Sequence, residues 1–512
     1  MRSHFKEDNM KKTILQNVQA LHGVEQQFDP APVDIVIEGS KIAAIVPGGT
    51  AHDGDVLPMS GRLAVPGLVD GHLHSHEHFQ KGRFENLPLE LWMNYVRTIK
   101  PVALTPRQIY LRTLIGAIEA LRTGSTTVVD DLSPGATLDP EVIDAVFQAY
   151  EDIGLRAVVG FSMMDRAIVD NYVDVDQIFS KELVTQLRGL PRPDPAALFS
   201  LIRRLAANRN PKQSRVGLMV SPSAPHRCTP EFLKQCRALA DELDLPAAIH
   251  AQETRLQVVT GMAFYGKTMI ARLAELGFLK PNTTLIHAVW LNADELKMIA
   301  DAGATVQHNA WSNLMLGSGS QPVRAVLDAG INVSLGADGC SSTFTCNMLN
   351  VMGTAAGLSK IRGDDYNRWL SAAETLKACT VGGANALGLG DRLGALAPGM
   401  TADLVLYKLA SPSFIPLGDP VRQLVYAERG QAVDASFVNG EAVMLNSQLT
   451  RVNEASLLRE IQMAYEELCP QFDEAEASMG PMRLAMEEVY KRSLQMKLPA
   501  GTYQARFSDS AH

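Results

Sequence analysis

The chain has no long hydrophobic segment and no cluster of basic residues. None of its apolar runs reaches the roughly 18 residues that a membrane-spanning helix needs, and the first residues, MRSHFKEDNMKK, lead into no apolar signal segment. The net charge of -9 at pH 7 is spread over the 512 residues without a basic block, which is not typical of proteins that bind nucleic acid or anionic lipid. We therefore expect a cytoplasmic protein that acts on a small molecule, with no nucleic-acid or membrane partner.

Cysteine is scarce and scattered. The sequence contains 6 cysteines, none of them in a C-x-x-C pair, and they stand at positions 228, 236, 340, 346, 379 and 469. This spacing argues against a disulfide framework and against a thiolate zinc site, and it is typical of a protein from a reducing compartment.

The two ends of the chain share one sequence pattern. Short strand-like segments with glycines at the breaks occupy residues 12–65, and similar segments return near residues 400–445. A chain of this length is too long for one ordinary core, so we expect a large domain and a smaller one. The two end pieces can pair into one small β-sandwich, although the pattern alone does not force this pairing.

Between these ends, short apolar runs alternate with stretches of helical period, which is typical of a parallel α/β domain. Thr229, for example, stands where it can cap a helix that begins "PEFLKQC". Eight such runs, with residues 165–197 as an insertion, predict a (β/α)8 TIM barrel. The eight runs are GLVDGHLH, TTVVDD, RAVVGF, RVGLMVS, PAAIH, TTLIHA, ATVQH and NVSLGAD.

After Arg451 the pattern becomes helical, behind Asn453 as a candidate cap. One face of the predicted helix carries an apolar stripe made of Leu457, Leu458, Ile461, Ala464, Tyr465 and Leu468. We interpret this segment as a docking helix. The expected domains are residues 1–66 and 397–450 for the two parts of the sandwich, 67–396 for the barrel, and 451–512 for a helical C-terminal extension.

Ionisable side chains mark the ends of the predicted barrel strands, where barrels carry their active sites. These side chains are His72, His74, His250, His287, His308 and Asp338. His72 and His74 are two residues apart, so they point to the same face of a strand and can bind one metal ion. His250 and Asp338 would complete the ligand set, and Glu253 follows His250 closely enough to serve as a general base.

Each of these side chains also has a structural interpretation. A lone histidine such as His308 is as often a hydrogen-bonded structural group as a substrate contact, and an H-x-H pair arises by chance on surface strands. Asp338, in "GADGCSS", has a turn residue as its default role. The joint pattern favours a metal centre. In it the H-x-H pair, the glutamate, the later histidine and the late aspartate stand at the ends of separate strands, in the order that a barrel requires.

Several segments resemble the amidohydrolase superfamily, and within it the branch of S-adenosylhomocysteine and methylthioadenosine deaminases and triazine chlorohydrolases. The resemblance spans about residues 12–445 and implies a metal-dependent barrel with a composite β-sandwich. The segments that carry it are VPGLVDGHLHSH, IHAQETRLQVV, YGKTMIARLAELGFL, LIHAVWLNADEL, QHNAWSNLMLGSG, VSLGADGCSS, PGMTADLVLY and FVNGEAV.

The resemblance also implies the role of each active-site residue. The metal ligands are His72, His74, His250 and Asp338. Glu253 is the proton shuttle, His287 holds the water or the substrate, and Asp338 also accepts a proton. Dinuclear members carry a carboxylated lysine on the fourth strand, and "RVGLMVSPSAPHRC" has no lysine. The resemblance therefore implies one divalent metal ion per chain, zinc or iron, and a homo-oligomer, a dimer or a tetramer.

The resemblance weakens at positions that contact the substrate in the related deaminases. Relatives carry L-P-L-x-E-W, whereas "LPLELWM" has Leu91 in place of the glutamate, with Glu90 displaced by one and Trp92 following. Relatives also carry P-H-A-P-Y, whereas "PSAPH" has Ser223 and His226 at the histidine and tyrosine positions. These changes weigh against an adenosine-type substrate, although a shifted loop would restore Glu90.

The segment after the H-x-H pair differs as well. His76, His78 and Gln80 follow the strand in the loop that covers the barrel rim, so they are candidate substrate contacts, with solvated loop residues as the equal alternative. The stretch "HSHEHFQ" resembles formimino-glutamate deiminases, which favours an amidine-type substrate as a second interpretation.

The leading hypothesis is a mononuclear metal-dependent deaminase, in which metal-activated water displaces ammonia or an amine from an amino-substituted nitrogen heterocycle. Hydrolysis of another C–N or C–Cl bond on the same scaffold remains open, because the ligands do not specify the leaving group. A non-catalytic barrel scaffold is the remote alternative. The sequence names neither the substrate nor the native metal.

Overall fold

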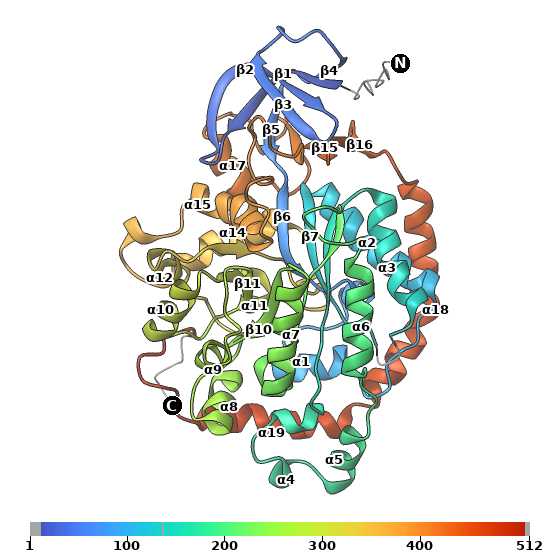
Figure 1. Ribbon diagram of the computed structural model, residues 1–512, viewed down its shortest axis with the longest axis vertical. Helices are drawn as coiled ribbons and strands as arrows, with labels where there is room; N and C mark the ends of the chain where they lie inside the picture. Colours follow the sequence, from blue (N-terminus) through green and yellow to red (C-terminus); the bar gives the residue numbers. More distant parts are fainter. Residues whose placement is uncertain (1–11, 136–137, 507–512) are drawn as a thin grey trace, which may run out of the picture.

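The computed structural model describes residues 12–135 and 138–506 (Figure 1). The polar N-terminal stretch in which we expected no signal segment lies almost wholly outside the described residues, as do the outermost ends of the predicted domains 1–66 and 451–512. In the part of the chain that is described, no helix is both long enough and apolar enough to cross a bilayer.

Strands from both ends of the chain form one nine-stranded sheet (Figure 1). Strand β5 pairs antiparallel with β14, and Val65 lies opposite Val405. The predicted pairing of the two ends is therefore confirmed. The strands are β1 (Lys12–His22), β2 (Gln27–Glu38), β3 (Lys41–Pro47), β4 (Asp55–Pro58), β5 (Arg62–Pro66), β14 (Leu404–Lys408), β15 (Val433–Val438), β16 (Glu441–Leu445) and β17 (Gln448–Leu449).

All eight apolar runs of the middle region form strands, and they pair in parallel within two four-stranded sheets. A bridge between Val220 and Ala247 connects the two sheets at one seam. At the other seam, the backbone N–H of Asp338 donates to the carbonyl of His72 over 2.7 Å. The strands are β6 (Leu68–Leu73), β7 (Ser125–Leu132), β8 (Arg156–Phe161), β9 (Val216–Leu218), β10 (Ala247–Ala251), β11 (Thr283–His287), β12 (Thr305–His308) and β13 (Val333–Leu335).

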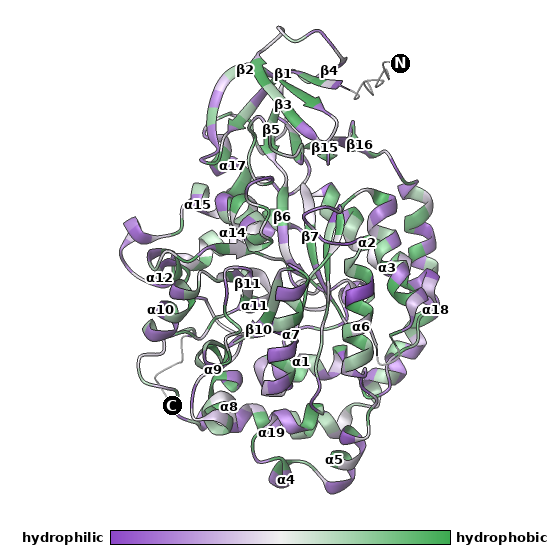
Figure 2. Ribbon diagram, viewed as in Figure 1, coloured by the Kyte–Doolittle hydropathy of each residue, from purple (hydrophilic) through white to green (hydrophobic). Residues whose placement is uncertain are grey.

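Helices follow most of these strands and place apolar faces against them (Figure 2). The predicted cap is confirmed, because the Thr229 hydroxyl accepts the Phe232 N–H at the start of α7. The helices are α1 (Leu89–Val96), α2 (Pro106–Arg122), α3 (Pro140–Ile153), α4 (Val175–Ile178), α5 (Lys181–Arg188), α6 (Pro195–Ala206), α7 (Pro230–Glu242), α8 (Arg255–Tyr265), α9 (Met269–Glu275), α10 (Ala293–Ala302), α11 (Ala310–Met315), α12 (Val323–Asp328), α13 (Cys340–Thr343), α14 (Met348–Ser359), α15 (Ala372–Lys377), α16 (Gly383–Ala386) and α17 (Pro420–Tyr426).

A buried ion pair connects the parallel strands to the nine-stranded sheet. Arg156, at the start of β8, donates from Nε and Nη2 to the Asp403 carboxylate over 2.7 and 3.1 Å. Asp403 also accepts the backbone N–H of Asn439 over 2.6 Å. Because buried charges are costly unless they are paired, these contacts fix how the two parts meet.

Two long helices complete the chain, α18 (Glu454–Ala477) and α19 (Gly480–Gln495). The Asn453 cap is confirmed, since its side chain accepts the Ser456 N–H over 3.1 Å. Ile461 and Leu468 pack against α2 as a docking helix should, but the assignment of Leu458 to the stripe is wrong. It is 41% exposed, because it lies on the solvent face beside the buried row. Helix α18 follows one side of the molecule, and α19 crosses the end opposite the nine-stranded sheet (Figure 1).

Candidate active site

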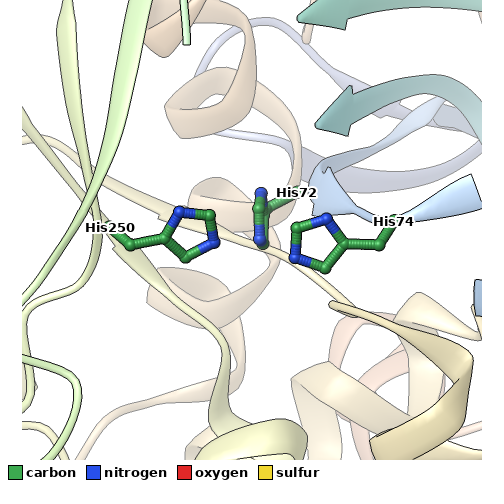
Figure 3. A group of neighbouring side chains, drawn as sticks. All are labelled: His72, His74 and His250. Carbon is green, nitrogen blue, oxygen red and sulfur yellow. The ribbon is translucent and has the colours of Figure 1, made fainter. Parts of the chain in front are cut away.

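Three histidines converge at the carboxyl ends of the parallel strands. His72 lies on β6 and His74 directly follows its last residue, Leu73, while His250 reaches them from β10 (Figure 3). The ring centroid of His72 lies 4.6 Å from that of His74 and 4.9 Å from that of His250. One ring nitrogen from each of the three lies within 4.8 Å of the others, which is close enough for a single metal ion.

The Asp338 carboxylate lies beside this group. Its Oδ1 is 3.6 Å from His72 Nε2 and 3.4 Å from His74 Nε2. Asp338 follows β13 with a φ of 71°, in the left-handed region, which aspartate adopts more often than most residues other than glycine. The fold therefore brings together the four predicted ligands from the first, fifth and eighth parallel strands.

The backbone prepares two of these histidines for a cation. His74 Nδ1 lies 2.8 Å from the carbonyl of Asp131, and His250 Nδ1 lies 2.9 Å from the carbonyl of Ser223. A carbonyl only accepts, so each Nδ1 carries the proton and each Nε2 keeps its lone pair. Such a bond to the far nitrogen is typical of metal-binding histidines.

His72 is buried, and neither of its ring nitrogens has a hydrogen-bond partner among the described residues. A buried imidazole whose nitrogens have no partner is energetically costly, unless a ligand such as a metal ion binds to one of them. Burial holds the pKa of His72 and of His250 well below the ordinary value, so both are neutral, as a ligand must be. Although burial alone would raise it, the pKa of Asp338 is lowered because His287, His72 and His74 surround it. The residues therefore fit a divalent cation.

Glu253 and His287 lie on the other side of Asp338. His287 Nε2 is 3.6 Å from Glu253 Oε2 and 3.6 Å from Asp338 Oδ2, while its Nδ1 lies 2.9 Å from Oδ1 of Asn313. His287 also has a left-handed backbone, with a φ of 70°. Burial raises the pKa of Glu253 to about 7, which suits a group that takes up and gives back a proton at neutral pH.

Two cavities meet at this site. We call the one against the ligands the inner cavity; its free volume is about 30 Å³. The outer cavity holds about 630 Å³, and Leu316 lines both. The inner cavity is lined by His74, Glu77, Leu89, Trp92, Met93, Arg97, Arg227, His250, Glu253, Gln257, His287, Leu316 and Asp338. Among the residues lining the outer cavity are Glu90, Thr254, Trp290, Ser318, Tyr490, Leu494, Tyr503 and Arg506.

Of the predicted substrate contacts, the structure places Trp92 in the inner cavity and Glu90 in the outer one. Both lie on α1, and Glu90 is buried. The Thr254 hydroxyl donates to Glu90 Oε1 over 2.6 Å. The carboxylate that is displaced by one position in the sequence thus lines the outer cavity, where it is bonded to the residue that follows Glu253.

The loop side chains after β6 lie mostly inside the protein. His76 accepts the backbone N–H of Ser133 over 3.2 Å, and its ring is 5.2 Å from that of His74. His78 turns away from both cavities, and Gln80 donates to the carbonyl of Val96 over 3.4 Å. None of these three described side chains lines the inner or the outer cavity.

Three further candidates also line neither of the two cavities. Ser223 holds others in place, because its carbonyl accepts from His250 and its hydroxyl accepts from Arg227 Nη1 over 3.1 Å. His226 is buried next to Arg227, and His308 is buried at the end of β12. Burial lowers the pKa of His308 to about 3, so its ring is neutral at pH 7.

Sequence reasoning missed several groups that surround the metal site. Glu77 and Arg227 line the inner cavity, and Asp131 lies with its Oδ2 3.8 Å from His250 Nδ1. Asp131 is the last residue but one of β7, so the strand-end rule applied to "TTVVDD" would have found it. Glu77 stands within the histidine run. No local pattern marks Arg227, which is brought in by a short 3₁₀ turn.

A parallel α/β fold with His, His, His and Asp at its strand ends defines a class of metal-dependent hydrolases. Residues 63–443, well over half of the sequence, match the amidohydrolase family. The chain belongs to that family, and it is a hydrolase acting on carbon–nitrogen bonds.

Relatives agree with this placement. The chain is 32% identical over 445 residues to a 5-methylthioadenosine/S-adenosylhomocysteine deaminase of Pyrococcus furiosus, covering 87% of this chain and 98% of the relative. It is 30% identical over 435 residues to a 5'-deoxyadenosine deaminase of Methanothermobacter thermautotrophicus, covering 85% of this chain and 94% of the relative.

Solved structures share the architecture. A zinc-bound adenosine deaminase from Xanthomonas campestris superposes with a TM-score of 0.78 at 26% identity, covering 90% of this chain and all of the other. A zinc complex of atrazine chlorohydrolase from Arthrobacter aurescens superposes with a TM-score of 0.80 at 24% identity, covering 88% of this chain and all of the other, and it supports the fold alone.

Proposed function

We propose that the protein is a mononuclear deaminase that hydrolyses the exocyclic C–N bond of an amino-substituted nitrogen heterocycle. One observation carries the proposal: the Glu253 carboxylate, with its pKa raised by burial to about 7, lies within 3.6 Å of His287 and lines the same small cavity as three of the four proposed ligands. Loss of ammonia requires a proton donor at this place, whereas a good leaving group such as chloride does not.

His72, His74, His250 and Asp338 would hold the cation, which we propose to be one Zn²⁺ per chain. When bound, a divalent cation supplies a Lewis acid that lowers the pKa of water from about 15.7 toward roughly 7. A single ion is favoured because β9 and the residues after it, up to Cys228, contain no lysine to bridge a second one.

The protein's own residues would move the protons. Glu253 accepts a proton from the attacking water and delivers it to a ring nitrogen, while the oxygen bonds to the carbon that bears the amino group. Asp338 accepts the second proton from the added hydroxyl and passes it to the amino group as the C–N bond breaks, so that the amine leaves as ammonia. His287 faces both carboxylates and holds the attacking oxygen between them.

The two cavities favour a substrate larger than a bare ring. The inner cavity, about 30 Å³, admits only the reacting edge, so the remaining substrate would lie in the outer cavity of about 630 Å³. Glu90 offers a buried carboxylate there for hydroxyl groups. A nucleoside, with a heterocycle and a hydroxyl-bearing sugar, fits this division, and the adenosine-type names of the relatives favour it.

The finer architecture belongs to the same proposal. We propose that the two parallel sheets close into one (β/α)8 barrel, since contacts join them at both seams, and that the nine-stranded sheet folds as a composite sandwich. The zinc-bound adenosine deaminase supports the metal. A homo-oligomer in the cytoplasm is the expected setting, and the free state of all six cysteines agrees with a reducing compartment.

The test is a screen for ammonia release from amino-purines, their nucleosides, pterins, triazines, pyrimidines and amidines, with metal analysis of the same samples. The proposal expects ammonia from at least one amino-heterocycle and the fastest turnover with a nucleoside. Chloride release from a chlorotriazine without ammonia release from any amine would favour the dechlorinating alternative. An inert, metal-free protein would support the scaffold alternative.

A further inference from the structure

A second cluster of metal-binding side chains lies behind the active site. Cys340 and Cys346 are six residues apart, and His78 is distant from both in the sequence. The Cys346 sulfur is 3.2 Å from the Cys340 sulfur and 3.6 Å from His78 Nε2. One donor atom from each of the three lies within 4.8 Å of the others, and all three residues are buried. We propose that this cluster is a second, structural cation site that binds Zn²⁺ through two thiolates and one imidazole.

The fold prepares His78 as a ligand. Its Nδ1 lies 2.9 Å from the carbonyl of Arg112, so Nδ1 carries the proton and Nε2 presents its lone pair to the sulfurs. The ring lies flush against α2 at Gly116, where a Cβ would be 1.9 Å from the ring Cε1. Only glycine leaves room for the imidazole there, and the ring is therefore held from both sides.

The distances favour a cation over a disulfide. Tetrahedral zinc, with Zn–S of about 2.3 Å and Zn–N of about 2.05 Å, sets its ligand atoms about 3.6 Å apart for S and N and about 3.8 Å apart for two sulfurs. The sulfur–nitrogen distance is already 3.6 Å, and the sulfurs at 3.2 Å need to separate by roughly 0.6 Å. A disulfide would require them to approach by more than about 1 Å.

Charge selects the kind of cation. Two thiolates and a neutral imidazole carry two negative charges, which a divalent ion cancels without help from a neighbouring cation. Soft sulfur donors exclude Mg²⁺ and Ca²⁺. Zn²⁺ satisfies both conditions.

The position of the cluster gives it a role. His78 lies on the turn that follows His72 and His74, and Cys340 begins α13, directly after the Asp338 loop. Ser341 already joins these two segments by a hydrogen bond to Glu77. A cation bound by His78, Cys340 and Cys346 would clamp from behind the segments that carry three of the four active-site ligands.

Cobalt substitution of the full-length protein tests the proposal. The active-site ligands are nitrogen and oxygen atoms, so a thiolate-to-Co²⁺ charge-transfer band in the near ultraviolet reports the second site alone. We expect this band in the wild-type protein, together with about two metal equivalents per chain. Cys346→Ala should lose the band and one equivalent. Cys236→Ala, which removes an equally buried cysteine away from the cluster, should keep both.

Three results would overturn the proposal: a wild-type cobalt protein without the band, a band that persists in Cys346→Ala, or peptide mapping that finds Cys340 and Cys346 joined as a disulfide in freshly isolated protein. If Cys346→Ala fails to fold, the wild-type spectrum decides. The outcome is independent of the proposed deaminase activity, because the band does not require turnover.

Discussion

The inner and outer cavities are neighbours built from different parts of the chain. The inner cavity, about 30 Å³, is formed by side chains at the ends of parallel strands, by the loops that follow them and by α1, and these include Glu253 and three of the four proposed ligands. The outer cavity, about 630 Å³, takes one wall from α19 and the segment after it, including Tyr490, Leu494 and Tyr503. The strands thus carry the groups of the proposed chemistry, while the C-terminal extension forms a wall of the cavity in which we propose that the rest of the substrate binds.

Removing a ligand should produce the largest effect, and only at the inner cavity. His250→Ala deletes one of three converging nitrogens, so we expect loss of the bound metal and a fall in kcat/KM of more than about 10³-fold. Metal analysis and ammonia release measure the two effects. His226→Ala is the matched control, because this buried histidine lines neither cavity. Full activity in metal-depleted His250→Ala would refute the assignment.

Changing the outer carboxylate should separate binding from chemistry. Glu90→Gln removes the charge that would accept hydroxyl hydrogen bonds, so kcat/KM for a nucleoside should fall about 10- to 100-fold. The value for the bare amino-heterocycle should not change, and neither should either value in the exposed control Glu85→Gln. An equal loss on both substrates would place Glu90 in the chemistry instead.

The pH profile should report the inner carboxylate. The pKa of Glu253 is raised by burial to about 7, and the ionised form takes the proton from water, so kcat/KM should fall about tenfold per pH unit on the acid side. A bound cation favours the carboxylate, and the midpoint of the active enzyme therefore lies at or below pH 7. An acid limb centred well above pH 7 would contradict this role.

The smallest effect is expected at the far wall of the outer cavity. Tyr490 accepts a hydrogen bond from Arg506 Nη1 over 3.1 Å, and both line the cavity. Tyr490→Ala should raise KM for a nucleoside by about three- to tenfold, with kcat and the KM of the bare heterocycle unchanged. A change in kcat alone would contradict the proposal that the inner cavity carries out the reaction and the outer cavity only binds the substrate.

Parallel strands made much of the inner site predictable from the sequence. Apolar runs identify the strands, and their carboxyl ends meet at one rim, so His72, His250 and Asp338 are found without knowing the loops. A loop follows no such rule. The sequence could not tell whether Glu90 or Leu91 faces the substrate, because that depends on the rotation of α1 about its own axis. The structure places Glu90 in the outer cavity.

Tertiary contacts determine the features of the sites that the sequence could not predict. His78 was a candidate substrate contact, but its ring lies against Gly116 of α2 and turns away from both cavities. Cys340 and Cys346 looked unrelated in sequence, and only the fold brings their sulfurs within 3.2 Å. The outer cavity likewise depends on where α19 docks, which an amphipathic pattern cannot specify.

The central claim is that Glu253 moves the protons of a deamination. Its most direct test is ammonia release by Glu253→Gln beside the wild-type protein, with the metal content of both measured. The account predicts an unchanged metal content and a fall in kcat of about 10²- to 10⁴-fold, because the amide keeps the shape and loses the proton transfer. Full turnover by a metal-replete Glu253→Gln protein would contradict it.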